Sequence, residues 1–253
     1  MPDQPKEAKS PEAKSPKKYK IDFYAILAHD LKSPLNTIEA TLELMRGKVL
    51  GENVDLYVPL LDKCINRMND MREMIRDVAD LWKIKAGDLP RNFSRIELGQ
   101  LVRTVIDSAS TQAQQKDVTI SLATAEEIAI EAVREEILLI VGHLIANAVK
   151  YNKQHGTVSI GLTRQSQYLC VEVNDTGIGM SAEESLKIGK EFVRIKNSKT
   201  VGIPGTGLGL AIAKRLADLY HGTITIESVP DQGSKFSLCL PLSHLSLSQL
   251  ERN

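Results

Sequence analysis

Residues 24–45 read YAILAHDLKSPLNTIEATLELM, and this stretch decides the first part of the fold. Its apolar residues recur at alternating spacings of four and three: Tyr24, Ala28, Leu31, Leu35, Ile38, Leu42 and Met45. Such a repeat predicts a helix packed in a coiled coil or bundle. A second repeat of the same kind follows: Leu61, Cys64, Met68, Met71, Ile75, Val78 and Trp82. The two repeats predict a long antiparallel helical hairpin with a short loop around Gly47 and Gly51.

The hairpin needs a partner surface, because two helices alone enclose too little core. Two copies that pair as a dimeric four-helix bundle are the economical solution. The alternative is a coiled coil within one chain that docks on the rest of the molecule. Pro34 lies inside the first repeat, where it removes a backbone hydrogen bond and predicts a kink.

Beyond the hairpin, the sequence has the pattern of a mixed α/β structure, and the boundary between the two parts is expected near Gly87–Ile96. Helices are predicted at 98–115, 135–151 and 208–220, where the 3.6-residue period is clear. Short apolar or alternating runs predict strands at 118–122, 128–131, 157–163, 169–174, 223–228 and 235–240.

The composition is that of a globular protein and excludes several classes. The chain has 253 residues, of which 42% are hydrophobic and 25% charged. Lys+Arg and Asp+Glu both number 32, so no basic field suggests nucleic-acid binding. The longest charge-free run, Phe236–Leu250, is too short and too polar to span a membrane. Residues 1–20 are rich in proline and lysine, which predicts a disordered linker or a basic arm.

The three cysteines, Cys64, Cys170 and Cys239, lie far apart in sequence with no metal-binding spacing. We therefore expect buried, reduced thiols in a cytosolic protein, and neither a disulfide framework nor a zinc site.

His29 is the first residue with catalytic potential. It stands one position after the stripe residue Ala28, so it is rotated about 100° from the apolar seam and should face solvent. A neutral imidazole is a good nucleophile near pH 7, and the adjacent Asp30 can orient it or accept its proton. An exposed His–Asp pair is more often plain surface, so this pair alone decides nothing.

Asn147, Lys150 and Tyr151 share one face of the helix predicted at 135–151, because they are three and four positions apart. An amide oxygen can ligate Mg²⁺, an ammonium group can pair with phosphate, and an aromatic ring can pack on a nucleotide. Taken alone, the segment is better explained as the polar outer face of an amphipathic helix.

Two glycine clusters favour the nucleotide interpretation. Asp175–Gly179 (DTGIG) follows a predicted strand, and Gly205–Gly209 (GTGLG) opens a predicted helix. Glycine lets the backbone approach a phosphate, and a helix N-terminus offers free N–H groups. Neither cluster has the spacing of a Rossmann or Walker motif. The polar, basic segment 180–204 between them is typical of a mobile flap over an anionic ligand.

Taken together, these residues resemble the ordered sequence boxes of two-component sensor histidine kinases. The similarity covers about residues 20–241. The matching segments are Phe23–Leu35 (H box), His143–Tyr151 (N box), Asp175–Gly179 (G1 box), Glu191–Arg194 (F box), Gly205–Gly209 (G2 box) and the closing segment Gln232–Phe236. The resemblance implies a phosphotransfer hairpin that dimerises, followed by a Bergerat-type α/β sandwich that binds ATP and Mg²⁺.

The resemblance also implies roles for the first helix. His29 would take the γ-phosphoryl group of ATP, and Asp30 would serve as its base. The group would then pass to an aspartate of a response-regulator receiver domain that docks on this helix. Ser33 stands where the family often has Thr or Asn, so a hydroxyl is retained for dephosphorylating the regulator.

For the nucleotide site, the resemblance assigns Mg²⁺ to Asn147, phosphate to Lys150, and ribose or adenine to Tyr151. His143 departs from the family, whose N box often begins with asparagine, so its role stays open. Asp175 would accept from the adenine amino group. The other residues implied around adenine or phosphates are Gly177, Gly179, Arg194, Gly205, Thr206, Gly207, Leu208 and Gly209.

The resulting domain prediction is a tail at 1–19, a phosphotransfer hairpin at 20–90, an ATP-binding domain at 91–243 and a C-terminal tail at 244–253. The predicted function is an autophosphorylating histidine kinase, either the cytoplasmic core of a longer receptor or a small kinase driven by separate partners. One alternative is a non-catalytic dimeric scaffold that binds nucleotide. Another is an ATPase of the gyrase, Hsp90 and MutL type, for which Glu135 and Glu136 lie too far from Asn147 to act as the hydrolytic base.

Overall fold

The computed structural model describes residues 16–87, 91–123 and 128–244. The chain forms two compact units, and the division falls between Arg72 and Glu73. We call them the helical unit and the α/β unit. The predicted fold class is confirmed, with a helical N-terminal part followed by an α/β part.

The helical unit contains the first predicted helix and the first half of the second. α1 (Pro16–Arg46) runs through Pro34 without ending, and a short 3₁₀ turn, η1 (Val54–Tyr57), leads into α2 (Val58–Ala86), whose first half belongs to this unit. The buried Tyr57 closes the connecting loop, since its hydroxyl accepts from Leu50 N and donates to Gly51 O, both at 3.0 Å.

The first helix begins earlier than the sequence suggested. Proline is favoured at the first helical position because its missing N–H has no partner there in any helix, and Pro16 takes that position. The prediction of disorder is therefore wrong for residues 16–20, whereas residues 1–15 lie outside the described residues.

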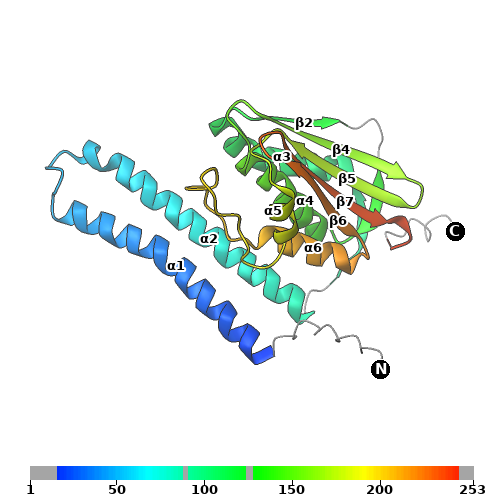
Figure 1. Cartoon of the computed structure of the whole chain (residues 1–253), viewed down its shortest axis with the longest axis horizontal. Coiled ribbons are helices and arrows are strands. Elements are labelled where there is room, and N and C mark those ends of the chain that lie inside the picture. The colour runs from blue at the N-terminus through cyan, green and yellow to red at the C-terminus, as the bar shows by residue number, and fades with distance from the viewer. Residues whose placement is uncertain (1–15, 88–90, 124–127, 245–253) are drawn as a thin grey trace, which may run out of the picture. The chain divides into compact units, whose positions relative to one another are not determined.

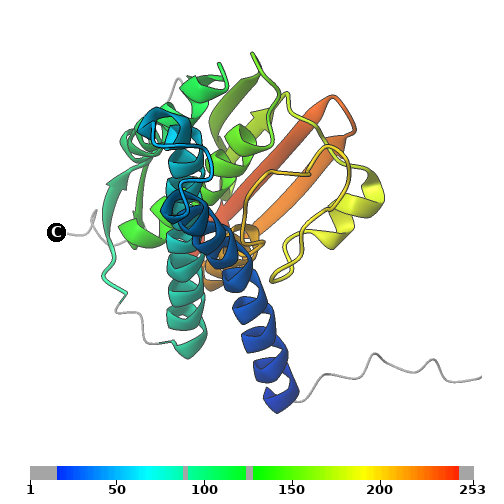
Figure 2. The same cartoon turned by 90° about the vertical axis from the view of Figure 1, so that its left-hand side faces the viewer.

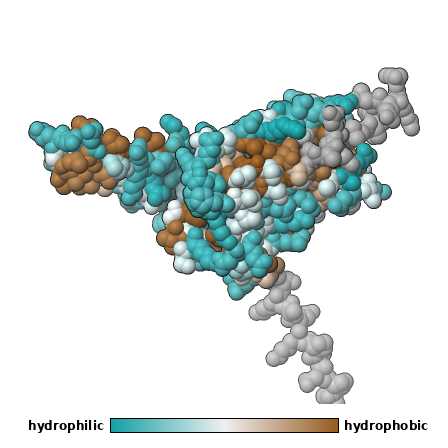
Figure 3. Space-filling model, turned by 90° about the horizontal axis from the view of Figure 1, so that it is seen from above, coloured by the Kyte–Doolittle hydropathy of each residue, from teal (hydrophilic) through white to brown (hydrophobic). Residues whose placement is uncertain are grey.

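Large apolar side chains are exposed along the hairpin, and Figure 3 shows them as brown patches toward the end that carries the connecting loop. They include stripe residues as well as Val49, Leu50, Val54, Leu56 and Val58.

The α/β unit is built on a five-stranded sheet with the strand order β2-β4-β5-β7-β6. The strands are β2 (Thr119–Ala123), β4 (Thr157–Gln165), β5 (Tyr168–Asp175), β6 (Thr223–Val229) and β7 (Gly233–Pro241). β2 pairs with β4 in parallel, and the other three pairings are antiparallel. β7 ends in a short 3₁₀ turn, η2 (Leu242–His244).

Three helices cover one face of this sheet: α3 (Leu98–Gln115), α4 (Arg134–Lys150) and α6 (Gly209–Leu219) (Figures 1 and 2). Alternate strand residues such as Val171, Val173 and Leu238 point to the helices and are buried, which is the period-2 pattern of a one-sided sheet. Leu144 and Ile145 of α4 meet them in the core.

Two short elements were not foreseen. β1 (Ser94–Glu97) pairs with β3 (Ala129–Ala132) in a separate two-stranded sheet, and four residues are too few to reveal a period. α5 (Ala182–Lys187) begins with a capping box, in which Ser181 and Glu184 each accept from the other's backbone N–H.

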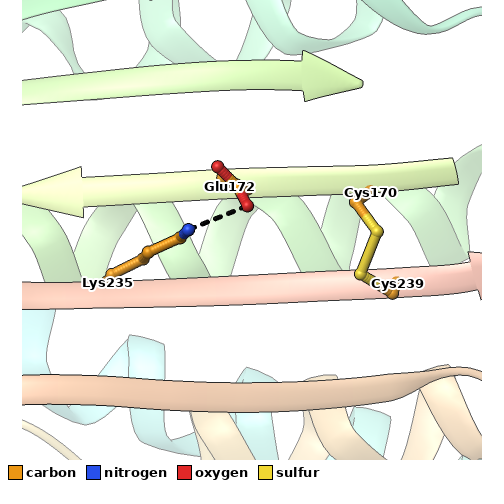
Figure 4. The surroundings of a disulfide bond; sticks show 4 residues. All are labelled: Cys170, Glu172, Lys235 and Cys239. Atoms are coloured by element: carbon orange, nitrogen blue, oxygen red, sulfur yellow. Dashed lines mark ion pairs between the residues drawn. A yellow bond between two sulfur atoms is a disulfide. The ribbon is translucent and has the colours of Figure 1, made fainter. Parts of the chain in front are cut away.

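The cysteine prediction is wrong for two of the three residues. Cys170 and Cys239 form a disulfide, whereas Cys64 is free and buried (Figure 4). The two half-cystines are 69 positions apart, yet β5 and β7 place them directly opposite each other. That register depends on the fold and cannot be deduced from cysteine spacing. On the same face, Lys235 pairs with Glu172 at 2.9 Å.

Candidate active site

His29 lies on the exposed face of α1, where the helical repeat placed it. Its side chain is 84% exposed. Its Nδ1 lies 3.0 Å from an oxygen of Asp30. This contact fits the imidazole tautomer in which Nδ1 donates to the carboxylate, and that tautomer leaves the lone pair on Nε2. Ser33, one turn later, is also exposed.

The α/β unit contains a cavity of about 190 Å³ bounded by α4, the end of β5 and the glycine-rich segment before α6. It brings together ten of the twelve residues predicted to bind the nucleotide: Asn147, Lys150, Tyr151, Asp175, Gly179, Arg194, Gly205, Thr206, Gly207 and Gly209. Two others are near but do not line it. Leu208 is buried in the core, and Gly177 packs against the backbone of Tyr151 and the carboxylate of Asp175.

Asp175 ends β5 as a buried carboxylate in the cavity wall. Its Oδ1 accepts from Gly177 N at 2.8 Å and from Ser234 N at 3.2 Å. Burial raises the pKa of this carboxyl to about 6, against the lowering effect of these two hydrogen bonds. At neutral pH the side chain is an ionised acceptor, which suits an exocyclic amino group.

The turn after Asp175 is held tightly against its neighbours. Ile178 N donates to Tyr151 O at 3.0 Å, which joins the turn to the end of α4. Gly179 has φ +59°, and a Cβ there would lie 1.9 Å from the backbone oxygen of Val229. Glycine is therefore required at this position by both conformation and space.

The cavity side of α4 carries His143, Asn147 and Lys150 on successive turns. The Lys150 ammonium lies beside Gly205, since a Cβ on that glycine would be 2.9 Å from Nζ. The ring of His143 packs against Gly209, and its Nε2 is buried with no hydrogen-bond partner among the described residues. Burial lowers the pKa of His143 to about 4, so the imidazole is neutral at pH 7.

The segment predicted as a flap is anchored at several points. The Arg194 guanidinium donates to Ile203 O at 2.5 Å, and Phe192 N donates to Gly207 O at 3.1 Å. Lys199 pairs with Asp231 at 2.6 Å on the surface. Arg194 thus closes the segment on itself while lining the cavity.

Sequence reasoning missed Asp77, which lies on the half of α2 that belongs to the α/β unit. Its buried carboxylate accepts from the Thr206 hydroxyl at 2.6 Å, and that hydroxyl accepts from Leu208 N at 3.0 Å. Burial raises the pKa of Asp77. A signal was available: Met74, Asp77, Leu81 and Ile84 repeat at spacings of three and four, and all four are buried.

A second contact joins α2 to the F box. Lys85 Nζ pairs with Glu191 at 2.8 Å, and Arg215 of α6 lies 3.8 Å from the same carboxylate. Glu191 is therefore held between two cations of the α/β unit.

Glu136 does not reach the cavity. Its buried carboxylate accepts from the Arg91 guanidinium at 3.1 and 3.0 Å and from the Tyr220 hydroxyl at 2.5 Å. Arg91 also stacks over the Tyr220 ring at 4.8 Å. Glu136 is the buried carboxylate at the start of α4, and its oxygens are bound by Arg91 and Tyr220 outside the cavity. It therefore cannot activate water for ATP hydrolysis there, which argues against the hydrolytic ATPase interpretation.

Among the described residues, no group of three or more His, Cys, Asp or Glu side chains could hold a metal ion. A divalent cation would have to be shared between the protein and a phosphate ligand. Asn147 and His143 lie one helical turn apart and both line the cavity, and the buried Nε2 of His143 has no hydrogen-bond partner among the described residues, so these two side chains fit that task. None of the described helices is long and apolar enough to cross a membrane.

Comparisons with known families give two matches in the same order as the two parts of the fold. Residues 19–87 match the His Kinase A (phospho-acceptor) domain. Residues 132–244 match the family described as histidine kinase-, DNA gyrase B-, and HSP90-like ATPase.

Curated relatives and solved structures agree with these matches. The chain is 27% identical to the Non-motile and phage-resistance protein of Caulobacter vibrioides, over 94% of this chain and 29% of that protein. It is 28% identical to Sensor histidine kinase WalK of Bacillus subtilis, over 87% of this chain and 36% of that protein. It thus spans less than half of either relative. A crystal structure of histidine kinase ThkA with response regulator protein TrrA has the same fold, with a TM-score of 0.71 at 19% identity, covering 90% of this chain and 64% of that one.

Proposed function

Because the chain belongs to the family of two-component sensor histidine kinases, we propose that it phosphorylates itself on His29 with ATP and relays the phosphoryl group to a response regulator. The observation that carries this proposal is the exposed His29–Asp30 pair, in which Nδ1 lies 3.0 Å from a carboxylate oxygen and the histidine side chain is 84% exposed. A buried histidine, or one hydrogen-bonded through both nitrogens, would not serve as an acceptor.

The proposed transfer follows from the tautomer with its proton on Nδ1. The lone pair of His29 Nε2 attacks the γ-phosphorus of ATP, the bond to the β,γ-bridging oxygen breaks, and ADP leaves. The imidazolium that forms is stabilised because its Nδ1 proton can pass to Asp30. The N–P bond is labile, which suits onward transfer to an aspartate.

The cavity supplies the nucleotide site in this proposal. Asp175 accepts from the adenine amino group, Gly177 and Gly179 shape that end, and Tyr151 packs near the ribose or adenine. Lys150, Arg194 and the Gly205–Gly209 backbone surround the phosphates. A Mg²⁺ ion held by Asn147 would neutralise phosphate charge when bound. Phosphoryl transfer depends mainly on such placement and charge neutralisation.

We further propose that the hairpin works as a homodimer. Leu35 and Leu42 of α1 are 45% and 52% exposed, and Met68 and Ile75 of α2 are 42% and 56% exposed. All four belong to the two apolar stripes, and contiguous apolar side chains on a helix surface indicate a binding partner. Pairing of two hairpins through these stripes would form a four-helix bundle.

The proposed partner is a response-regulator receiver domain, docked on the exposed flanks of α1 near His29. The solved complex of ThkA with response regulator protein TrrA supports this partner. Ser33 is exposed one turn from His29, and we assign its hydroxyl to positioning water when the regulator is dephosphorylated. The reaction would take place in the cytoplasm, where ATP is available.

The test is labelling with [γ-³²P]ATP and Mg²⁺. The wild type should incorporate an acid-labile, base-stable phosphate, and His29→Gln should incorporate none while binding ADP unchanged. His155→Gln is a matched control, because His155 is also exposed and lies 3.7 Å from a carboxylate, Asp117. ADP binding without any labelling of the wild type would instead support the non-catalytic scaffold. Labelling that persists in His29→Gln would reject the assigned acceptor.

A further inference from the structure

His143 is a half-buried residue with no role in the mechanism above. Its Nε2 is the side-chain polar atom that is buried without a hydrogen-bond partner among the described residues. Buried polar atoms are paired in the great majority of cases, and an unpaired one needs an explanation such as an absent ion or ligand. The sequence makes the same point independently, because an imidazole stands here where the family often has an amide.

The surroundings of the ring fix its position without using Nε2. His143 lies one helical turn before Asn147 on α4, and both residues line the cavity. A Cβ on Gly209 would lie 2.6 Å from Nδ1, so the imidazole packs directly on the glycine that begins α6. Packing therefore holds the ring at the cavity wall, beside the segment assigned to phosphates.

The charges around the ring favour a cation. A neutral imidazole has one ring nitrogen with a lone pair that can bind a metal ion, and the Nε2 of His143 makes no hydrogen bond to the described residues. The acidic groups that act on it are Glu73 and Asp80 of α2, and the opposing cation is Lys150. Asp77 of α2 also lines the cavity, although its carboxylate is occupied by Thr206.

We propose that His143 Nε2 binds the divalent cation that accompanies the nucleotide, together with the Asn147 amide oxygen, and that this nitrogen ligand shifts the site toward late first-row cations such as Co²⁺. Imidazole binds those cations better than it binds Mg²⁺, which prefers oxygen ligands. The inference rests on the proposed nucleotide site, but not on His29 or on phosphoryl transfer.

The first experiment uses untagged wild-type protein with Mn²⁺ and a non-hydrolysable ATP analogue. Pulsed EPR should detect nitrogen coupling to Mn²⁺, and the coupling should change from the ¹⁴N to the ¹⁵N pattern in protein grown with [¹⁵N]histidine. Adenine nitrogens cannot produce that change. Bound Mn²⁺–nucleotide without a histidine coupling would overturn the inference, and this result does not depend on whether any variant folds.

The second experiment compares metal preference in the wild type and His143→Asn by calorimetric titration of the same analogue with Co²⁺ and with Mg²⁺. Losing even an indirect partner of a metal changes affinity about 10–100-fold, so the ratio of Co²⁺-supported to Mg²⁺-supported affinity should fall at least about tenfold. His155→Asn, an exposed histidine outside the cavity, should leave the ratio unchanged.

The outcomes separate the two proposals. Suppose that the His143→Asn variant folds, still binds nucleotide, and keeps the same ratio of Co²⁺-supported to Mg²⁺-supported affinity. That result would overturn the assignment of His143 as a metal ligand and leave the nucleotide site standing. No binding of the analogue with any cation in the wild type would overturn the nucleotide site, and the metal ligand with it.

Discussion

The two units differ in where they place their apolar side chains. The α/β unit buries its own within one chain: Leu144, Ile145 and Leu238 are fully enclosed between the helices and the sheet. The hairpin leaves Leu35, Leu42 and other stripe residues open to solvent. A fold that completes its core alone can be stable as a monomer, whereas the two-helix hairpin would gain its core from a second copy in the proposed homodimer. The comparison can be tested from either side.

The largest effect is expected from charging the exposed stripe. Leu35→Asp combined with Leu42→Asp should abolish dimerisation, because each buried leucine contributes about 1.5–3 kcal/mol and each occurs twice in a symmetric dimer. Light scattering coupled to gel filtration measures the result. Ala40→Asp adds a charge to an exposed position off the stripe and should leave the dimer intact. A dimer that survives both leucine changes would contradict the proposed interface.

The next largest effect is expected from a substitution that creates a void in the α/β core. Leu144→Ala should lower the free energy of unfolding of this unit by about 2–5 kcal/mol, because it removes a fully buried side chain. Chemical denaturation followed by circular dichroism provides the value. Leu219→Ala, at a position that is 40% exposed, should cost less than about 1 kcal/mol. Equal costs for the two leucines would mean that the core is wrongly placed, and neither change should affect the dimer.

The disulfide adds a covalent constraint that the hairpin lacks. Reducing Cys170–Cys239 should destabilise the α/β unit by about 2–4 kcal/mol, because the bond closes a long loop in the unfolded chain. Denaturation with and without reductant measures the difference, and a Cys170→Ser, Cys239→Ser double variant should not respond. Thiol titration of the unfolded, unreduced protein should find one thiol, Cys64. Three titratable thiols would show that the bond does not form.

The smallest effect is expected from protonation of Asp175 in the proposed nucleotide cavity. The pKa of Asp175 is raised to about 6 by burial, so its carboxylate is ionised above that pH and protonated below it. ADP affinity should therefore fall as the pH drops through about 6, while the same protonation stabilises the folded state because the folded pKa exceeds the unfolded one. Calorimetry between pH 5 and pH 8 tests this. Asp175→Asn should weaken binding by about 1.5–3 kcal/mol and remove this pH step.

Features that depend on local pattern were predictable from the sequence. The heptad stripes located α1 and α2, and the glycine clusters placed Asp175 at a strand end and Gly209 at a helix start. Ten of the twelve residues predicted to bind the nucleotide line the cavity. These predictions succeeded because periodicity and backbone conformation are properties of short segments.

Features that depend on long-range pairing were not predictable in the same way. The disulfide requires the β5–β7 register, and the contact of Asp77 with Thr206 joins residues 129 positions apart. The interpretation of α2 as a single amphipathic helix used one apolar stripe and overlooked the second, on which a carboxylate sits among Met74, Leu81 and Ile84. Polar residues within a buried stripe should be treated as candidates for tertiary contacts.

The Arg91–Glu136–Tyr220 network extends the fold of the α/β unit upstream of its family match. The family match begins only at residue 132, but Glu136 is satisfied by a guanidinium 45 positions upstream. A truncation that starts after Arg91 would strand an anion in the protein interior, a defect that typically costs about 3–5 kcal/mol. Anyone isolating this module by limited proteolysis or expression should therefore keep Arg91, and a start at Glu73 would also retain the contacts of Asp77 and Lys85.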